Sequence, residues 1–253
     1  MIVGQTGLRL SFLLERGALV VYISLADINI EIDTDSEYIK KKCRDYIAEF
    51  ETPDLKIKIS DSEIEKEMAL SPGFSRDYYE SLCVYRAICL RMPLYNRLLL
   101  HSVVIEADGR GYAFAAKSGV GKTTHMRMWL EAFGDSVTVI NGDKPIYAIE
   151  NGKVYAYGTP WCGKEGYNAN RKTEICAIGF IYRSEENKTE RISANSALDT
   201  IFNQILMPQD TQAAIKTLDM AGMLLEKIPL YKIECNISAD AARVARKVLD
   251  KAQ

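Results

Sequence analysis

A loop of small residues between an apolar strand and a helix constrains this chain more than any other feature. Residues 112–124 have the sequence YAFAAKSGVGKTT, an apolar stretch followed by glycines, one lysine and two threonines. This pattern is typical of a phosphate-binding loop, in which consecutive backbone N–H groups wrap the phosphates of a nucleotide. We therefore expect an α/β protein with a nucleotide site where this strand ends and the helix begins.

Each loop position has a physical role in this interpretation. Gly119 and Gly121 let the backbone turn and approach the phosphate oxygens without a Cβ in the way. Lys122 reaches the β- and γ-phosphates, and the Thr123 hydroxyl can hold Mg²⁺. The strict pattern begins with Gly where this chain has Ala116, which tolerates a tight turn if its φ stays negative. The predicted nucleotide-binding residues are Ser118, Gly119, Val120, Gly121, Lys122, Thr123 and Thr124.

Composition excludes several other classes of protein. The 253 residues include 32 basic and 34 acidic ones, spread along the chain, so bulk charge favours neither nucleic acid nor an anionic membrane. No uncharged apolar run approaches the roughly 18–20 residues that span a bilayer. The six cysteines form no CxxC pair and no zinc-type spacing with the two histidines. With no evident signal peptide at the start, we expect a cytoplasmic protein.

The segment before the loop predicts a histidine beside the phosphate site. A helix is expected over residues 77–92, ended by Pro93. A buried strand over 98–105 and a turn at 108–111 then form a hairpin with the strand that enters the loop. His101 therefore belongs to a neighbour of the loop strand. Two interpretations stay open at this point, a catalytic histidine or an ordinary hydrogen-bonded strand histidine.

An acidic residue follows the next strand. After the loop helix, expected over 123–133, an apolar strand over 137–140 ends in Asn141-Gly142-Asp143-Lys144-Pro145. A carboxylate just past a strand that follows a phosphate loop is where a Mg²⁺ ligand or a catalytic base is expected. The alternative is a turn aspartate before proline; the upstream loop favours the functional interpretation.

The remaining chain gives a mixed α/β pattern with one further loop, residues 158–167, of a kind that carries function more often than scaffold segments do. Asn151-Gly152 predicts a hairpin between strands 146–149 and 153–157, and a Gly- and Pro-rich segment, 158–167, follows it. We expect a strand-rich N-terminal lobe over 1–95 and a nucleotide-binding core over 96–253. The other expected elements are strands 8–14, 18–23, 55–59, 175–182 and 230–235, helices 37–50, 196–206 and 211–227, and a last helix from Ser238 to Lys251.

At these residues the chain resembles a known family. AKSGVGKTT, with His101 before it and Asp143 after it, is similar to the catalytic domain of HPr kinase/phosphorylase, which is related in fold to the phosphoenolpyruvate carboxykinases. The resemblance is closer to short HPr-kinase-like proteins that share a segment like GTPWCGKEG, and it extends from about residue 98 to 165. It implies a P-loop kinase core with a mixed sheet and flanking helices.

The resemblance also implies roles for single residues. His101 matches the active-site histidine of the family, Lys122 the loop lysine and Thr123 the Mg²⁺-binding hydroxyl. Glu165 falls where the family places a second acidic metal ligand. The family usually has two adjacent aspartates where this chain has Gly142-Asp143, so the division of metal binding and proton acceptance between Asp143 and other residues is open.

These features lead us to expect a kinase that uses ATP and Mg²⁺. It would move the γ-phosphoryl group to a hydroxyl of a small protein, a peptide or a small molecule, with Asp143 and His101 accepting the proton and Lys122 neutralising the phosphates. A homo-oligomer is compatible with the sequence. One alternative is a carboxykinase, although the further basic and metal-binding residues of that enzyme class are not evident. Another is a nucleotide-gated binding module without phosphotransfer.

Overall fold

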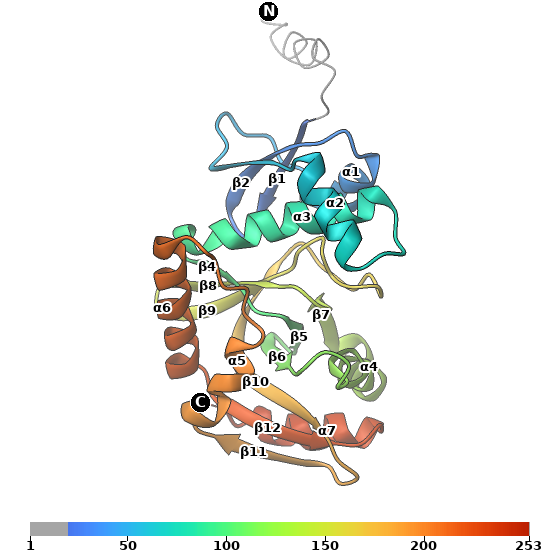
Figure 1. The fold of residues 1–253 in the computed structure, drawn as a ribbon. Helices are drawn as coiled ribbons and strands as arrows, with labels where there is room; N and C mark the ends of the chain where they lie inside the picture. Colours follow the sequence, from blue (N-terminus) through green and yellow to red (C-terminus); the bar gives the residue numbers. More distant parts are fainter. Residues whose placement is uncertain (1–19, 253) are drawn as a thin grey trace, which may run out of the picture. The chain divides into compact units, whose positions relative to one another are not determined.

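A long strand, β10 (Lys172–Arg183), connects the two halves of the larger sheet in this computed structural model, which describes residues 20–252 (Figure 1). On one side its first residues pair antiparallel with β9 (Lys153–Tyr157), and its last residues pair parallel with β12 (Leu230–Cys235). On the other side it pairs parallel with β6 (Arg110–Ala115). The protein is thus a mixed α/β structure.

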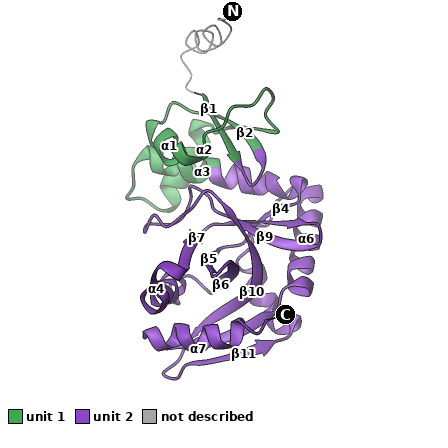
Figure 2. Cartoon of the chain, turned by 180° about the vertical axis from the view of Figure 1, so that it is seen from behind, with its two compact units in different colours: residues 1–24, 29–84 green, residues 25–28, 85–253 purple. Residues whose placement is uncertain are grey.

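The chain divides into two compact units (Figure 2). Of the described residues, the first comprises 20–24 together with Asn29–Val84, and the second comprises Leu25–Ile28 and residues 85–252. The division falls within α3 (Arg76–Arg91). The domain boundary at residue 95 that the sequence suggests stays a prediction.

The first unit contains a small three-stranded sheet in the order β1-β2-β3. β2 and β3 run parallel, with Ile30 opposite Leu55. The predicted helix over 37–50 is wrong beyond its first turns, because Ile47 bridges to Ile23 and the Ala48 N–H donates to the Tyr22 carbonyl. The elements are β1 (Val20–Leu25), β2 (Ile28–Asp33), α1 (Glu37–Lys42), the 3-10 turn Arg44–Tyr46, β3 (Leu55–Lys58) and α2 (Asp61–Leu70).

The larger sheet belongs to the second unit and has nine strands in the described chain, in the order β4-β8-β9-β10-β6-β5-β7 with β12 and β11 attached to β10. Its remaining strands are β4 (Arg97–Leu99), β5 (Ser102–Ala107), β7 (Val137–Asn141), β8 (Ile146–Glu150) and β11 (Lys188–Ile192). The helices are α4 (Lys122–Phe133), α5 (Ala194–Phe202), α6 (Thr211–Lys227) and α7 (Ala239–Leu249), with 3-10 turns at Met92–Tyr95 and Gly134–Ser136.

Side chains of the central strands alternate between two apolar cores. Tyr112 and Phe114 of β6 pack with Trp129 of α4 on one face, in a core that α7 also lines. Ala113 of β6 faces the opposite core, which α5 and α6 cover with residues such as Leu224. This period-two pattern fixes the register of β6. It therefore also fixes where the loop after β6 begins.

The apolar run over 98–105 is two strands and not the single strand that we predicted. β4 pairs with β8, whereas β5 pairs with β6 and β7. At the break, Leu100 bridges to Ile205 and the His101 N–H donates to the Gln204 carbonyl at 2.8 Å. The residues are buried on both sides of the break, so hydrophobicity alone does not reveal the change of partner.

Most other predicted elements of the larger sheet are confirmed, including β12 and the β8–β9 hairpin, whose Asn151 and Gly152 both have positive φ. Ser238 is the N-cap residue of α7, but its hydroxyl donates to Asn236 and makes no capping hydrogen bond. β2, α2 and β11 were not predicted. The strand expected over 8–14 lies outside the described residues.

Candidate active site

Four chain segments meet at one edge of the larger sheet because of its strand directions. β5 runs antiparallel to both β6 and β7, so β6 and β7 point the same way, and β10 is parallel to β6. The carboxyl ends of β6, β7 and β10 and the beginning of β5 therefore lie at the same edge. This arrangement brings together the loop after β6, His101 before β5, the Asn141–Lys144 turn after β7 and Arg183 at the end of β10.

The loop after β6 has the backbone that its sequence predicts. Gly119 has φ +77° and Gly121 has φ +134°, conformations that residues with a side chain rarely adopt. Ala116 is not among the residues with positive φ, so it is compatible with the turn that its position requires. α4 begins directly after Gly121. Its first N–H groups, which have no partner within the helix, are thereby directed at the loop.

Lys122 is a buried cation at the start of α4. Only 8% of its surface is exposed, and its Nζ donates to the Ala116 carbonyl at 3.0 Å. Burial lowers the pKa of Lys122, the nearby Asp143 carboxylate opposes this shift, and the Lys144 charge adds to it. Thr123 and Thr124 follow in the first turn of α4 and are half-buried.

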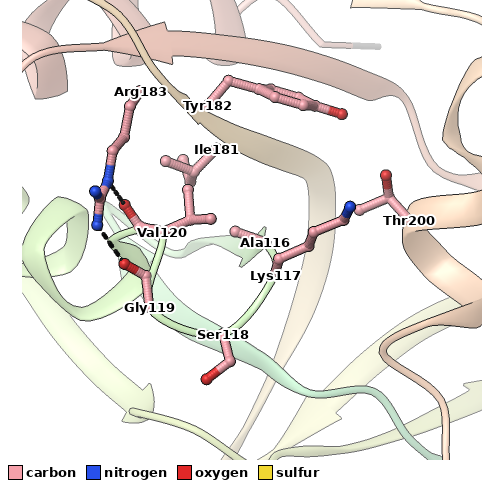
Figure 3. Close-up of a pocket in the computed structure, with 9 residues that line it drawn as sticks. All are labelled: Ala116, Lys117, Ser118, Gly119, Val120, Ile181, Tyr182, Arg183 and Thr200. Carbon is pink, nitrogen blue, oxygen red and sulfur yellow. Dashed lines mark hydrogen bonds between the residues drawn. The ribbon is translucent and has the colours of Figure 1, made fainter.

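Arg183, at the end of β10, forms hydrogen bonds to the loop after β6. Its guanidinium donates to the carbonyls of Gly119 and Val120, the latter at 3.0 Å (Figure 3). A trans peptide places its C=O and its N–H on opposite sides. The contact with the Val120 carbonyl therefore turns the N–H of Gly121 away from Arg183. The Val120 N–H is used within the loop, where it donates to the Lys117 carbonyl at 3.2 Å.

Asp143 lies between two basic side chains. One oxygen, Oδ1, is 2.9 Å from His101 Nε2, and the other, Oδ2, pairs with Lys144 Nζ. All three side chains are half-buried, with 22% of the Asp143 side chain, 33% of His101 and 34% of Lys144 exposed. Residues 42 positions apart in the sequence thus form one polar cluster at the sheet edge.

The charge state of Asp143 follows from these neighbours. Burial alone would raise the pKa of Asp143, but the hydrogen bond from His101 and the charge and hydrogen bond of Lys144 outweigh it and lower the pKa to about 2. The carboxylate is therefore ionised at neutral pH and only accepts hydrogen bonds. The His101 Nε2 contact is accordingly an N–H donated to Asp143.

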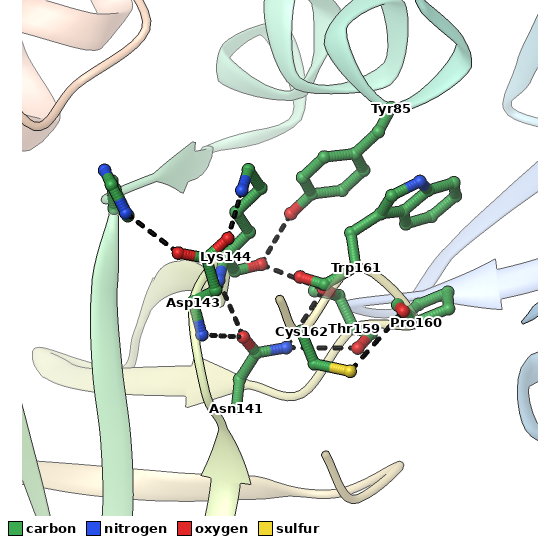
Figure 4. A network of polar contacts seen from close by, with 9 residues as sticks. Tyr85, Asn141, Asp143, Lys144, Thr159, Pro160, Trp161 and Cys162 are labelled. Carbon is green, nitrogen blue, oxygen red and sulfur yellow. Dashed lines mark hydrogen bonds and ion pairs between the residues drawn. The ribbon is translucent and has the colours of Figure 1, made fainter. Parts of the chain in front are cut away.

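The turn that carries Asp143 is fixed by Asn141, which is fully buried (Figure 4). The Asn141 side-chain oxygen accepts the N–H groups of Asp143, at 2.9 Å, and Lys144, at 2.7 Å. Its Nδ2 donates to the backbone carbonyl and the hydroxyl of Thr159, both at 3.1 Å. One amide thus satisfies two N–H groups of the turn and joins the turn to the chain that follows β9.

The aromatic residues Tyr85 and Trp161 pack behind this turn (Figure 4). The Tyr85 hydroxyl donates to the Lys144 carbonyl at 2.6 Å, and the Thr159 hydroxyl donates to the same oxygen at 2.9 Å. The Trp161 ring stacks on Tyr85 with centroids 4.3 Å apart and an angle of 16° between planes. Side chains of α3 and of residues 158–171 therefore hold the buried face of the Asn141–Lys144 turn. We call residues 158–171 the Trp161 loop.

Gly142 leaves no room for a second carboxylate. A Cβ at this position would lie 2.9 Å from the Cys162 carbonyl and 3.3 Å from the Tyr167 carbonyl, and the Gly142 N–H donates to the latter at 2.9 Å. A contact as short as the one with the Cys162 oxygen does not occur for real side chains, so a Cβ at position 142 would require a backbone shift. The Trp161 loop thus occupies the space that a side chain at 142 would need.

Glu165, at the exposed part of the Trp161 loop, pairs with Arg127 of α4. The Glu165 side chain is 40% exposed and that of Arg127 is 55% exposed. This contact links the Trp161 loop to α4, the helix that follows the Ala116–Gly121 loop. A role of Glu165 as a metal ligand stays a prediction.

The donor chemistry of the site is compatible with Mg²⁺. This ion takes one or two protein oxygens at a phosphate loop and fills its other positions with water and phosphate oxygens. Thr123 can supply a hydroxyl and Asp143 an ionised carboxylate. Between residues 20 and 252 no three His, Cys, Asp or Glu side chains gather into a cage for a metal ion.

Three residues described by the structure fall outside the predicted site: His125, Asn141 and Arg183. His125 of α4, the second histidine, is fully buried; it accepts the Trp129 Nε1–H at 3.1 Å, and burial lowers its pKa to about 3. It is a core residue. Arg183 and Asn141 were missed, since no local motif marks a residue whose partners are distant in sequence.

None of the helices between residues 20 and 252 combines the length and apolar character that crossing a bilayer requires. All six cysteines are free thiols.

Comparison with known proteins gives little beyond these observations. No family model and no curated protein matches the sequence. The structure is similar to that of the HPr(Ser) kinase/phosphatase from Coxiella burnetii, with a TM-score of 0.34 and 12% identity, over 60% of this chain and 97% of that one. This structural similarity is too weak to indicate a function, so a functional assignment rests on the residues of the site.

Proposed function

We propose that this protein is an ATP-dependent phosphotransferase that moves the γ-phosphoryl group of ATP to a hydroxyl group. The observation that carries this proposal is the ionised Asp143, held by His101 and Lys144 at the same sheet edge as the phosphate loop and Lys122. Phosphoryl transfer asks a protein mainly to position the reactants and to neutralise charge. A fixed carboxylate beside a cationic phosphate loop meets both needs.

The chain's own residues divide this work. The loop N–H groups and Lys122 hold the phosphates, and Thr123 with Asp143 can hold Mg²⁺, which neutralises the charge on the phosphate oxygens when bound. The acceptor oxygen forms a bond to the γ-phosphorus while the bond to the β–γ bridging oxygen breaks and ADP leaves. Asp143 takes the hydroxyl proton, and His101 orients the carboxylate. The acceptor is the hydroxyl of a small protein, a peptide or a small molecule.

One observation favours a second candidate function, a nucleotide-gated binding module without transfer. Both oxygens of Asp143 are already paired, and its pKa of about 2 makes it a weak base. In a loose phosphoryl-transfer transition state the proton moves late, so a weak but well-placed base suffices. We therefore favour the kinase, and labelling with ATP distinguishes the two functions.

The test is transfer of label from γ-labelled ATP, with wild type, Lys122→Ala and the exposed-surface control Lys188→Ala. The acceptors come from fractionated cell extract. We expect labelled acceptor with wild type and Lys188→Ala. Loss of a preorganised charge such as Lys122 should lower transfer by about 10²–10³. ATP binding without label transfer or ATP consumption in any fraction would establish the second candidate. Absence of ATP binding would overturn both.

A further inference from the structure

A cavity of about 500 Å³ opens between the phosphate loop and the end of β10 (Figure 3). This volume is within the range of small-ligand sites. The loop contributes Ala116 to Val120, β10 contributes Ile181 to Arg183, and α5 contributes Thr200. His101, Asp143 and Lys144 are not part of this lining, so the carboxylate cluster lies outside the cavity.

We propose that this cavity holds the base of a purine nucleoside triphosphate, stacked on the Tyr182 ring. The inference rests on the proposed function, because it assumes that the loop binds the phosphates. A nucleotide whose γ-phosphate faces Asp143 must extend its base away from that carboxylate. The cavity shares a wall with the phosphate loop and is therefore within reach of the base.

Tyr182 offers an aromatic surface at the required place. It is 39% exposed, whereas its neighbour Ile181 is 4% exposed and belongs to the core. Lys232 Nζ lies over the Tyr182 ring, 5.6 Å from its centroid, and is itself bonded to Glu234 at 2.8 Å. The ring is thus supported by a cation on one face. Base–aromatic stacking uses an accessible ring of this kind and tolerates different bases.

Polar groups beside the ring suit the edge of a purine. The side chains of Lys117 and Thr200 line the same cavity as Tyr182 (Figure 3). A hydroxyl can donate and accept, and an ammonium group donates to ring nitrogens or a carbonyl. A few placed polar groups in a mainly apolar site are the usual arrangement for a small ligand. The larger ring of a purine covers more of Tyr182 than a pyrimidine does.

The experiment compares ATP, CTP and inorganic tripolyphosphate, which has the phosphates without the base. Dissociation constants are measured by calorimetry for wild type, Tyr182→Ala, Tyr182→Phe and Lys122→Ala. We expect wild type to bind ATP more tightly than CTP. Tyr182→Ala should weaken ATP about tenfold, in line with the loss of one stacked base, and change tripolyphosphate less than twofold. Tyr182→Phe should retain ATP affinity.

The outcomes separate this inference from the function on which it rests. If Tyr182→Ala leaves ATP affinity unchanged, or weakens ATP and tripolyphosphate equally, the base does not stack on Tyr182 and the inference is wrong. If wild type binds neither ligand, or Lys122→Ala leaves both unchanged, the phosphate loop is not a nucleotide site and the proposed function fails with it. Thermal unfolding of Tyr182→Phe and Tyr182→Ala controls for loss of the fold.

Discussion

The Asn141–Lys144 turn and the Ala116–Gly121 loop lie at the same sheet edge but are built differently. In the turn, the backbone N–H groups of Asp143 and Lys144 and the Lys144 carbonyl are all bonded to side chains. In the loop, Lys117, Ser118 and Gly119 are exposed. The side-chain hydrogen bonds described for this loop come from Lys122 and Arg183, and both side chains donate to backbone carbonyls. One region is fixed by the protein, whereas the other keeps N–H groups for a ligand.

This difference matches two different tasks. A carboxylate that acts on a substrate proton must be placed before the substrate arrives, because small displacements cost much of the rate. A phosphate loop instead gains its final hydrogen bonds from the phosphates. We therefore expect changes in the turn to alter turnover and protein stability, and changes in the loop to alter affinity for the nucleotide.

The largest effect is expected for Asp143→Asn. This variant keeps the size of the side chain but removes the proton acceptor, so phosphotransfer should fall by about 10²–10⁴, while ATP affinity stays within several-fold. The measurements are turnover and ATP dissociation constant across a Mg²⁺ titration. If excess Mg²⁺ restores turnover, Asp143 is primarily a metal ligand and its assignment as base is wrong.

Asn141→Ala should break the turn without touching the reacting groups. It removes four hydrogen bonds and leaves buried N–H groups unpaired, at about 1–3 kcal/mol for each such group. We expect a clear drop in the free energy of unfolding and a fall of turnover by about 10²-fold through misplacement of Asp143. Thr159→Val, which removes only hydroxyl contacts, is the matched control and should have a smaller effect on both. An unchanged unfolding midpoint in Asn141→Ala would contradict this account of the turn.

Arg183→Gln should loosen the loop. The guanidinium is exposed and binds two carbonyls, so we expect ATP and tripolyphosphate to bind less tightly by about threefold to tenfold, with turnover at saturation nearly unchanged. Parallel loss of both ligands distinguishes this variant from Tyr182→Ala. A fall of turnover with unchanged affinity would show that the loop and the turn are coupled.

The smallest effect is expected at the Glu165–Arg127 pair. An exposed ion pair contributes little to stability, so Glu165→Gln should change turnover at saturating Mg²⁺ less than about threefold while raising the Mg²⁺ concentration that half-activates the enzyme. Arg127→Gln is the informative partner, because it frees the Glu165 carboxylate and should lower that concentration. Identical Mg²⁺ curves for the two variants and wild type would exclude Glu165 as a metal ligand.

The sequence predicts local features of this site better than its long-range contacts. β6, α4 and β7 and the positive φ of Gly119 and Gly121 follow from apolar periodicity and from glycine chemistry. The break between β4 and β5 does not, because burial on both sides hides a change of strand partner. Arg183 and Tyr85 lie 63 and 59 positions from Val120 and Lys144, whose carbonyls they contact, and only the folded chain brings these residues together.

The crowding around Gly142 has a consequence for which substitutions this site can accept. Replacing the glycine by aspartate, which would give two adjacent carboxylates, would press a new Cβ against the Cys162 and Tyr167 carbonyls. The protein can accommodate this substitution only if the Trp161 loop shifts. That loop is held in place by the hydrogen bonds of Thr159 and the stacking of Trp161 on Tyr85. The Asn141–Lys144 turn and the Trp161 loop would therefore have to change together. The single substitution Gly142→Asp therefore cannot create a paired-carboxylate site in this chain without a backbone shift.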